Sequence, residues 1–289
     1  MNRVDAHHHI WDITTRVQPW MSAPGYEPMA RSFTAADHAV LAHAAGVDAS
    51  VVVQCVGEEA ETLELLAVAD VDPVIGAVVG WVDLTAPDVV DRIAALREAP
   101  GGHRLRGIRH QVHDEPDPDW LRRPDVQRGI RAVGAAGLAY DLLLKPPQMT
   151  AAIATVAELD DVPFVVDHAA KPPIASGERE PWASLLHALA EHEHVTCKLS
   201  GLTTEASWRS WMLDDLQPYV DVVLESFGPE RVMAGSDWPV CTLATTYDAA
   251  LRLADRFTDH LSPAERAAVL AGTARRVYRL DPLATVGSP

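Results

Sequence analysis

The sequence lacks the features of membrane-spanning, secreted and disulfide-stabilised proteins. No apolar run reaches the roughly 18 consecutive residues of a membrane span, and the N-terminal residues carry no apolar stretch typical of a signal peptide. The three cysteines are odd in number and widely spaced, and none form a C-x-x-C pair. Such cysteines fit buried thiols in a reducing compartment better than a disulfide framework. We therefore expect a cytoplasmic protein with no membrane partner.

Positive charge is also scarce. Lys and Arg together number 24 against 41 Asp and Glu, which gives a formal net charge of −17. Nucleic acids and anionic membrane surfaces would repel such a chain, so we expect a small-molecule partner and no nucleic acid. Only three of the cations are lysines, Lys145, Lys171 and Lys198, and each lies at or just after the end of an apolar run. This placement indicates sites that need a compact ammonium, although chance could produce it among so few residues.

A glycine-rich phosphate turn, which an open doubly wound sheet normally carries after its first strand, is missing here. Instead, short β-branched apolar runs alternate with segments of helical period along the whole chain. Eight strands, each followed by a helix, predict an α/β protein whose parallel sheet closes into a (β/α)8 TIM barrel. No linker divides residues 1–289, so we expect a single domain. The predicted strands are Arg3–Ile10, Ala49–Cys55, Val74–Trp81, Leu105–His110, Leu138–Lys145, Pro163–His168, Val195–Ser200 and Arg231–Ser236.

Helix signals lie between these strands. Thr34 and Asp37 resemble a capping box at the start of the first helix, and Ser262-Pro263 predicts the start of an additional C-terminal helix, Ala264–Tyr278. Residues 14–32 carry no regular period, and we expect them either to fold over the barrel mouth or to pack on a neighbouring subunit of a homo-oligomer. The other predicted helices are Ala35–Ala45, Glu58–Ala69, Pro87–Arg97, Pro124–Ala136, Thr150–Leu159, Pro181–Glu191, Trp208–Ser226 and Thr246–His260.

The first strand carries two histidines that suit a metal site. Barrel enzymes place their active site at the C-terminal ends of the strands. Strict alternation puts Asp5, His7 and His9 on one face of this strand, which we expect to point into the barrel. Two imidazoles at this spacing can share a metal ion or a polar substrate oxygen. The alternative is a pair of histidines that hydrogen-bond within the core.

His168 and Asp237 lie at two further strand ends. His168 follows a buried-strand pattern, and Asp237 lies where the eighth strand meets its loop. A carboxylate beside a histidine cluster can ligate a metal, accept a proton from water, or do both. We therefore predict His168 and Asp237 as catalytic residues and, with His7 and His9, as metal ligands. The alternatives are a core histidine and a turn aspartate.

Cations and aromatic residues near the same strand ends are candidates for substrate contact. Alternation allows only one of Arg109 and His110 to face inward unless the strand bulges there. The lysines could bind carboxylate or hydroxyl groups, and the two tryptophans could form a wall against a sugar-like ring. The predicted substrate-binding residues are Trp11, Arg109, His110, Lys171, Lys198 and Trp238.

Five motifs occur along the predicted barrel in this order: Val4-Asp5-Ala6-His7-His8-His9-Ile10-Trp11-Asp12, Gly107-Ile108-Arg109-His110, Val166-Asp167-His168-Ala169-Ala170-Lys171-Pro172, Lys198-Leu199-Ser200-Gly201-Leu202 and Gly235-Ser236-Asp237-Trp238-Pro239. Together they resemble the amidohydrolase superfamily, and more narrowly its lactonase branch of fuconolactonase-like, rhamnonolactonase-like and 2-pyrone-4,6-dicarboxylate lactonase-like enzymes. The motifs span residues 4–239.

This resemblance implies a barrel hydrolase that opens lactones of sugar acids or related small esters. It matches His7 and His9 to the first-strand pair of the family, His168 to the sixth-strand histidine and Asp237 to the eighth-strand aspartate. The sequence departs from metal-rich amidohydrolases because Lys145, not a second histidine, ends the fifth strand. The resemblance implies one divalent metal ion, with zinc the first choice, or a site that works without metal.

The predicted reaction is hydrolytic ring opening, with Asp237 as general base toward water. A metal-dependent decarboxylase on the same scaffold is the first alternative. A barrel that binds ligand but has lost its chemistry is the second, and it is disfavoured because all four strand-end groups are chemically competent.

Overall fold

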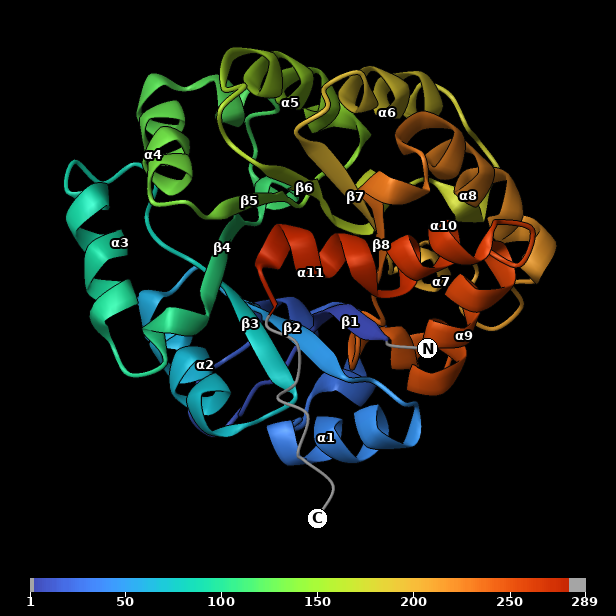
Figure 1. Cartoon of the computed structure of the whole chain (residues 1–289), viewed down its shortest axis with the longest axis horizontal. Coiled ribbons are helices and arrows are strands. Elements are labelled where there is room, and N and C mark those ends of the chain that lie inside the picture. The colour runs from blue at the N-terminus through green and yellow to red at the C-terminus, as the bar shows by residue number, and fades with distance from the viewer. Residues whose placement is uncertain (1–2, 281–289) are drawn as a thin grey trace.

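The computed structural model describes residues 3–280, and residues 1–2 and 281–289 of the predicted domain lie outside the described residues. Eight parallel strands follow one another in chain order around a barrel, which confirms the predicted (β/α)8 fold (Figure 1). Among the described residues, no helix is both long and apolar enough to cross a membrane. The strands are β1 Val4–His8, β2 Ala49–Val53, β3 Ile75–Gly80, β4 Leu105–His110, β5 Ala139–Leu142, β6 Phe164–Val166, β7 Val195–Leu199 and β8 Val232–Ala234.

The helices surround this barrel, and most begin within a few residues of the predicted positions. The capping box of Thr34 and Asp37 is present at the first helix. The largest differences are α5, which begins earlier because Pro146-Pro147 fit its first turn, and the predicted 208–226 helix, of which only α8 forms. The helices are α1 Ala35–Ala44, α2 Glu59–Val71, α3 Val89–Glu98, α4 Pro124–Ala135, α5 Pro146–Glu158, α6 Trp182–Ala190, α7 Leu202–Glu205, α8 Leu213–Phe227, α9 Tyr247–Phe257, α10 Pro263–Ala267 and α11 Thr273–Tyr278.

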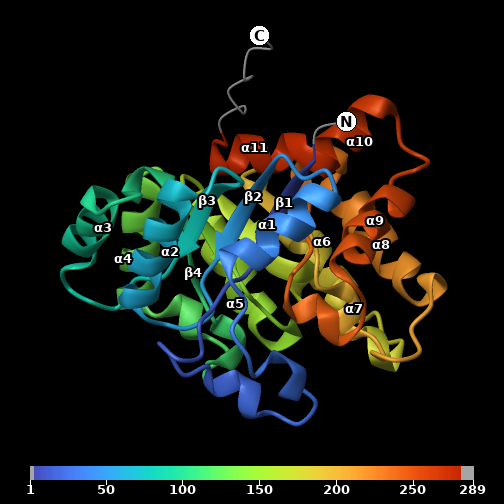
Figure 2. The same ribbon diagram turned by 90° about the horizontal axis from the view of Figure 1, so that it is seen from below.

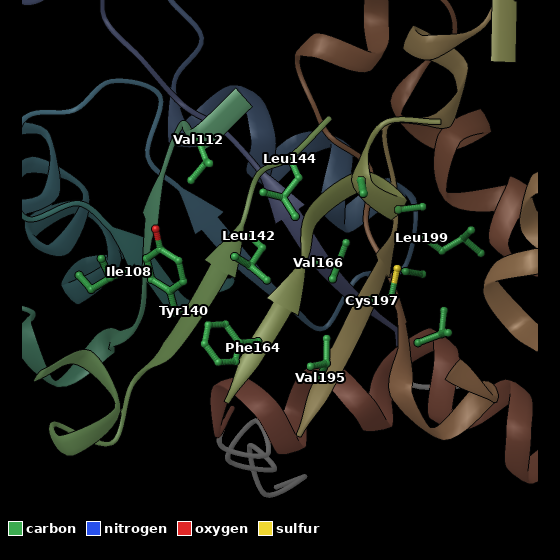
Figure 3. Packing of buried hydrophobic residues seen from close by; sticks show 14 of the residues in the cluster. Ile108, Val112, Tyr140, Leu142, Leu144, Phe164, Val166, Val195, Cys197 and Leu199 are labelled. Atoms are coloured by element: carbon green, nitrogen blue, oxygen red, sulfur yellow. The ribbon is translucent and has the colours of Figure 1, made fainter. Parts of the chain in front are cut away.

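The outer face of the sheet forms most of the hydrophobic core. Neighbouring strands present large apolar side chains such as Ile108, Tyr140 and Phe164 at adjacent positions, as Figure 3 shows. All three are fully buried. At roughly 25 cal/mol per Å² of apolar surface removed from water, such side chains supply most of the free energy that holds the helices on the barrel.

The predicted C-terminal helix forms as α10 and α11, joined by a π-helical turn over residues 268–272. It crosses one end of the barrel, opposite the end where α7 lies (Figures 1 and 2). Ala274 and Tyr278 pack there against small interior residues such as Val4 and Ala6. The C-terminal helix therefore closes the bottom of the barrel, and the active-site end remains opposite to it.

A β-bulge in β1 corrects the predicted facing of this strand. Asp5 pairs with Ser50 and His8 with Val52, so two residues of β1, Ala6 and His7, lie opposite one residue of β2. Val4 and Ala6 consequently pack inside the barrel, whereas strict alternation places them on the face opposite Asp5 and His7, outside the barrel. The prediction that Asp5 points inward was wrong for the same reason. The inward direction of His7 was predicted correctly.

Candidate active site

Four predicted side chains converge at the C-terminal ends of β1, β6 and β8. Their meeting point is Oδ1 of Asp237, which lies 3.9 Å from Nε2 of His7, 3.5 Å from Nε2 of His9 and 3.9 Å from Nε2 of His168. The Nε2 atoms of His7 and His9 are 3.2 Å apart. All four residues are at least 94% buried. Groups separated by up to 230 residues in sequence therefore form one compact polar cluster.

A left-handed turn directs His168 into this cluster. His168, Ala169, Ala170 and Lys171 have φ values between 50° and 58°, a region that costs a residue with a Cβ about 1–2 kcal/mol. The indole N–H of Trp182 donates to the Ala169 carbonyl at 2.7 Å and helps to hold the turn. Sequence reasoning did not predict this turn, because no glycine marks it.

Two glycines provide the room that the histidine rings need. A Cβ on Gly201 would lie 2.7 Å from Nδ1 of His168, and a Cβ on Gly235 would lie 2.9 Å from Cβ of His7. Real Cβ atoms do not approach neighbours so closely, so larger residues at either position would displace an imidazole. The glycines of two of the family-like motifs thus serve the packing of the site.

The Nδ1 nitrogens of His9 and His168 each have a hydrogen-bonding partner outside the cluster. Nδ1 of His9 lies 2.7 Å from the Val53 carbonyl, which can only accept, so this nitrogen carries a proton and Nε2 is the ring nitrogen that faces Asp237. Nδ1 of His168 lies 2.8 Å from the Ser200 hydroxyl. Outer partners of this kind set the tautomer and orientation of metal-binding histidines.

The electrostatics of the cluster favour neutral imidazoles around an ionised carboxylate. Burial, together with nearby Lys198, lowers the pKa of His7 well below its usual value, and burial lowers the pKa of His168 to about 4. Burial acts against ionisation of Asp237, but His168 and His9 outweigh it and lower the pKa of the carboxyl. At neutral pH the cluster thus presents nitrogen lone pairs and a negative oxygen, which are ligands for a divalent cation.

A second polar layer lies directly beneath this cluster. Nζ of Lys198 lies 2.6 Å from Asp141, 2.9 Å from Asp167 and 3.2 Å from Nδ1 of His7. Nη1 of Arg109 donates to Asp167 at 3.0 Å and lies 3.3 Å from Nε2 of His7. The hydroxyl of Tyr278, from α11, donates to Asp141 at 2.6 Å. This layer links the metal-ligand candidate His7 to the helix that closes the barrel bottom.

Among the described residues, the atoms best placed to share a metal ion belong to His7, His168 and Asp237, which lie within 4.8 Å of one another. Oδ1 of Asp237 is buried and has no hydrogen-bond partner. A buried carboxylate oxygen without a hydrogen-bond partner is costly, and a cation would satisfy it. The donor set therefore fits a divalent ion such as zinc, with His9 adjacent.

The sequence matches the amidohydrolase family over residues 4–280. The chain belongs to this family. It is 40% identical to the L-fucono-1,5-lactonases of Burkholderia multivorans and Burkholderia ambifaria, with 96% of this chain and 96% of each relative covered. A crystal structure of a Burkholderia multivorans amidohydrolase with bound zinc is 38% identical, with a TM-score of 0.90 over 97% of this chain and 100% of that one. These relatives agree with the resemblance to the lactonase branch of the amidohydrolases.

Within this amidohydrolase, the cations predicted to bind substrate lie at different depths. Arg109 points into the barrel, whereas His110 points away, where it stacks on Trp120 at 4.3 Å and lies 2.7 Å from Glu115. The expectation that only one of the pair faces inward is therefore correct. Lys198 is fully buried in the lower layer.

Lys171 lies closer to the surface, with a side chain that is 21% exposed and 2.6 Å from Glu205. Burial acts against its charge, but Glu205 and then Asp237 outweigh burial and raise the pKa of Lys171. Of the three lysines that follow apolar runs in the sequence, Lys171 is therefore the one that combines charge, partial exposure and an electrostatic interaction with Asp237.

The predicted tryptophan wall is largely buried. Trp11 is 6% and Trp238 3% exposed, and both pack edge-on against Phe33. More accessible aromatic rings come from residues 14–32 and from the segment after α7, where Tyr26 packs edge-on against Trp208 at 5.4 Å. Figure 2 shows residues 14–32, in dark blue, at the end of the barrel opposite α11. This position agrees with the expectation that the segment folds over the barrel mouth.

Sequence reasoning missed Asp141, Asp167 and Tyr278 as parts of the site. A signal was present for the carboxylates, because Asp141 stands in an apolar strand and Asp167 stands directly after one. A charged residue on the inner face of a buried strand needs an opposite charge beside it. The two strand-end cations Arg109 and Lys198 could have been matched to them.

Proposed function

We propose that this protein hydrolyses lactones of sugar acids to the open hydroxy acids. The observation that carries the proposal is the convergence of three imidazoles on the unpartnered Oδ1 of Asp237 at the catalytic end of a barrel. The 40% identity to L-fucono-1,5-lactonases over nearly the whole chain supports a lactone as substrate. We also propose that residues 1–289 form one domain.

His7, His168 and Asp237 would hold a divalent ion, zinc by preference, with His9 completing the nitrogen face. When bound, such an ion supplies Lewis acidity, which polarises a carbonyl oxygen and lowers the pKa of water. The four side chains contribute imidazole nitrogens and one carboxylate, which is the donor chemistry that zinc takes in hydrolases.

Asp237 acts as the general base. The water oxygen forms a bond to the lactone carbonyl carbon while the Asp237 carboxylate accepts one water proton. The ring C–O bond then breaks, and the proton passes from Asp237 to the departing ring oxygen. The new carboxylic acid ionises and releases a proton to solvent, so turnover acidifies the solution.

Two cations support the proposed site, one at the substrate and one beneath His7. Lys171, partly exposed and on the same turn as His168, orients substrate hydroxyl groups or stabilises the negative oxygen that develops at the carbonyl. Arg109, held 3.3 Å from Nε2 of His7, keeps the imidazole in place from below. We assign Lys198 to positioning through the lower layer instead of the substrate contact expected from sequence, because its ammonium is fully buried and paired with two carboxylates.

A pH-indicator screen of sugar-acid lactones tests the proposal. The untagged protein should acidify solutions of 1,5- and 1,4-lactones, lose activity after chelation and regain it with zinc. If activity survives complete metal removal, verified by elemental analysis, the proposed lactone hydrolysis stands and the proposed metal requirement is rejected. Release of CO2 from aromatic acids without lactone turnover would favour the decarboxylase instead. Tight lactone binding without turnover would identify an inactive barrel.

A further inference from the structure

The barrel has one seam where its first and last strands meet. An isolated bridge between His8 of β1 and Trp238, in the segment that follows β8, takes the place of a regular ladder there. Two backbone hydrogen bonds join the two segments, from the Asp237 N–H to the His7 carbonyl at 2.8 Å and from the His9 N–H to the Trp238 carbonyl at 2.6 Å. The residues on either side of this seam include three of the four proposed metal ligands.

The carboxylate of Asp5 spans this seam from the outer side of the sheet. Its Oδ1 accepts the backbone N–H of Ser236 at 2.8 Å and that of His7 at 3.2 Å. Its Oδ2 accepts the Ser236 hydroxyl at 2.7 Å. Asp5 has no exposed surface, and hydrogen bonds to a buried charge are stronger than neutral ones.

The same network continues to the far side of Asp237. The Ser236 hydroxyl accepts the backbone N–H of Trp238 at 3.0 Å, so both chain neighbours of Asp237 are tied to Asp5. Asp237 itself has a φ of 57°, which a residue with a Cβ adopts only when its surroundings hold it there. One carboxylate thus fixes the backbone at His7 and on both sides of Asp237.

We propose that Asp5 is a positioning residue of the metal site. It holds His7 and Asp237, which come from opposite ends of the chain, at the separation that a shared divalent ion requires. The bulge in β1 makes this possible, because it turns Asp5 outward toward Ser236 while His7 still points inward. The inference rests on the metal site of the proposed function.

Cobalt titration of metal-free protein tests this role. Asp5→Asn preserves the shape of the side chain and removes its charge. Loss of an outer-shell partner typically weakens metal affinity about 10- to 100-fold, so we expect that loss, together with an altered visible absorption of bound Co²⁺. Ser236→Ala, which retains the Asp5 charge and removes one bridging hydroxyl, should give a smaller change in the same direction.

The matched control is Asp255→Asn. Asp255 also binds the first strand region, through Arg3 at 2.6 Å, but it connects that region to α9 away from the site. It should leave the Co²⁺ affinity and spectrum at wild-type values even where the melting temperature falls.

Wild-type Co²⁺ affinity and spectrum in both Asp5→Asn and Ser236→Ala would overturn the inference and leave Asp5 a support of the fold only. If Asp5→Asn does not fold, Ser236→Ala alone decides between these outcomes. A wild-type protein that opens lactones but takes up no Co²⁺ would remove the metal site and this inference together, while lactone hydrolysis would stand. A wild-type protein that binds Co²⁺ but opens no lactone would leave the inference intact and reject the proposed substrate.

Discussion

The two polar layers inside the barrel differ in how their charges are matched. In the lower layer, two cations and two carboxylates compensate one another, and Lys198 alone contacts both Asp141 and Asp167. In the upper layer, three imidazoles surround Asp237, whose Oδ1 has no hydrogen-bond donor. Each carboxylate of the lower layer has a cationic nitrogen within 3.0 Å, whereas the side chains that surround Asp237 in the upper layer are imidazoles. Only the upper layer has the composition of a cation site.

His7 belongs to both layers and connects them. Its Nε2 faces the upper cluster, and its Nδ1 lies 3.3 Å from Asp167 and 3.2 Å from the Lys198 ammonium. The two carboxyl groups of the lower layer also differ in the direction of their pKa shifts. Burial raises the pKa of Asp141 to about 6, whereas at Asp167 burial is outweighed by Lys198 and His7, which hold the pKa well below its usual value. Asp167 therefore supplies the fixed negative charge beneath the site.

The largest expected effect comes from the upper layer. Asp237→Asn removes the proposed base and the carboxylate ligand while it preserves the size of the side chain. General-base catalysis contributes about 10²- to 10⁴-fold, so kcat with the best lactone should fall by at least that range. Circular dichroism and urea unfolding should show an intact fold. Activity within roughly tenfold of wild type would remove Asp237 from the mechanism.

The next largest effect should come from the lower layer and should be seen in stability. Lys198→Met leaves Asp141 and Asp167 buried without their shared ammonium, and removal of one partner from a buried ion pair typically costs about 3–5 kcal/mol. Urea unfolding of metal-free protein measures this loss. Lys145→Met, at an exposed lysine, is the control and should change little. A loss below about 1 kcal/mol at Lys198, the level of a surface pair, would show that the layer is not held by charge.

The sequence was sufficient to predict the barrel, since strand-like and helical periods alternate eight times and the strand ends collect polar residues. It also predicted His7, His9, His168 and Asp237 as neighbours, because parallel strands in a barrel bring all their C-terminal ends to one rim. The close distances among these groups agree with that reasoning. Their catalytic and metal-binding roles remain predictions for the experiments above.

The sequence could not reveal features that depend on local departures from regular geometry. Strict alternation failed at β1 because a bulge leaves no mark in residue type there, and Asp5 was placed on the wrong face as a result. The left-handed turn from His168 to Lys171 was missed because glycine, its usual signal, is absent. Both departures occur beside the site, where they re-aim the side chains that the proposed chemistry uses.

A smaller effect is expected where the lower layer meets the C-terminal helix. Tyr278→Phe preserves the ring in the barrel bottom and removes the hydroxyl that donates to Asp141 at 2.6 Å. Hydrogen bonds to charged groups contribute about 1.5–3 kcal/mol, and urea unfolding should show a loss of that size. Tyr219→Phe removes a 3.0 Å hydrogen bond to the neutral carbonyl of Glu178 and should cost about 0.5–1.5 kcal/mol. Equal losses at the two tyrosines would indicate that Asp141 is not ionised.

The smallest effect should come from an ion pair outside the barrel. Arg92 lies 2.9 Å from Glu59 and 2.8 Å from Asp88, distances similar to those of Lys198, but its side chain is 40% exposed. Water and salt screen such pairs, which therefore contribute little to stability. Arg92→Gln should therefore change the free energy of unfolding by less than Lys198→Met does, and 1 M NaCl should abolish most of the difference from wild type. An Arg92→Gln loss as large as that of Lys198→Met would mean that pair geometry, and not burial, determines what the interior layer contributes.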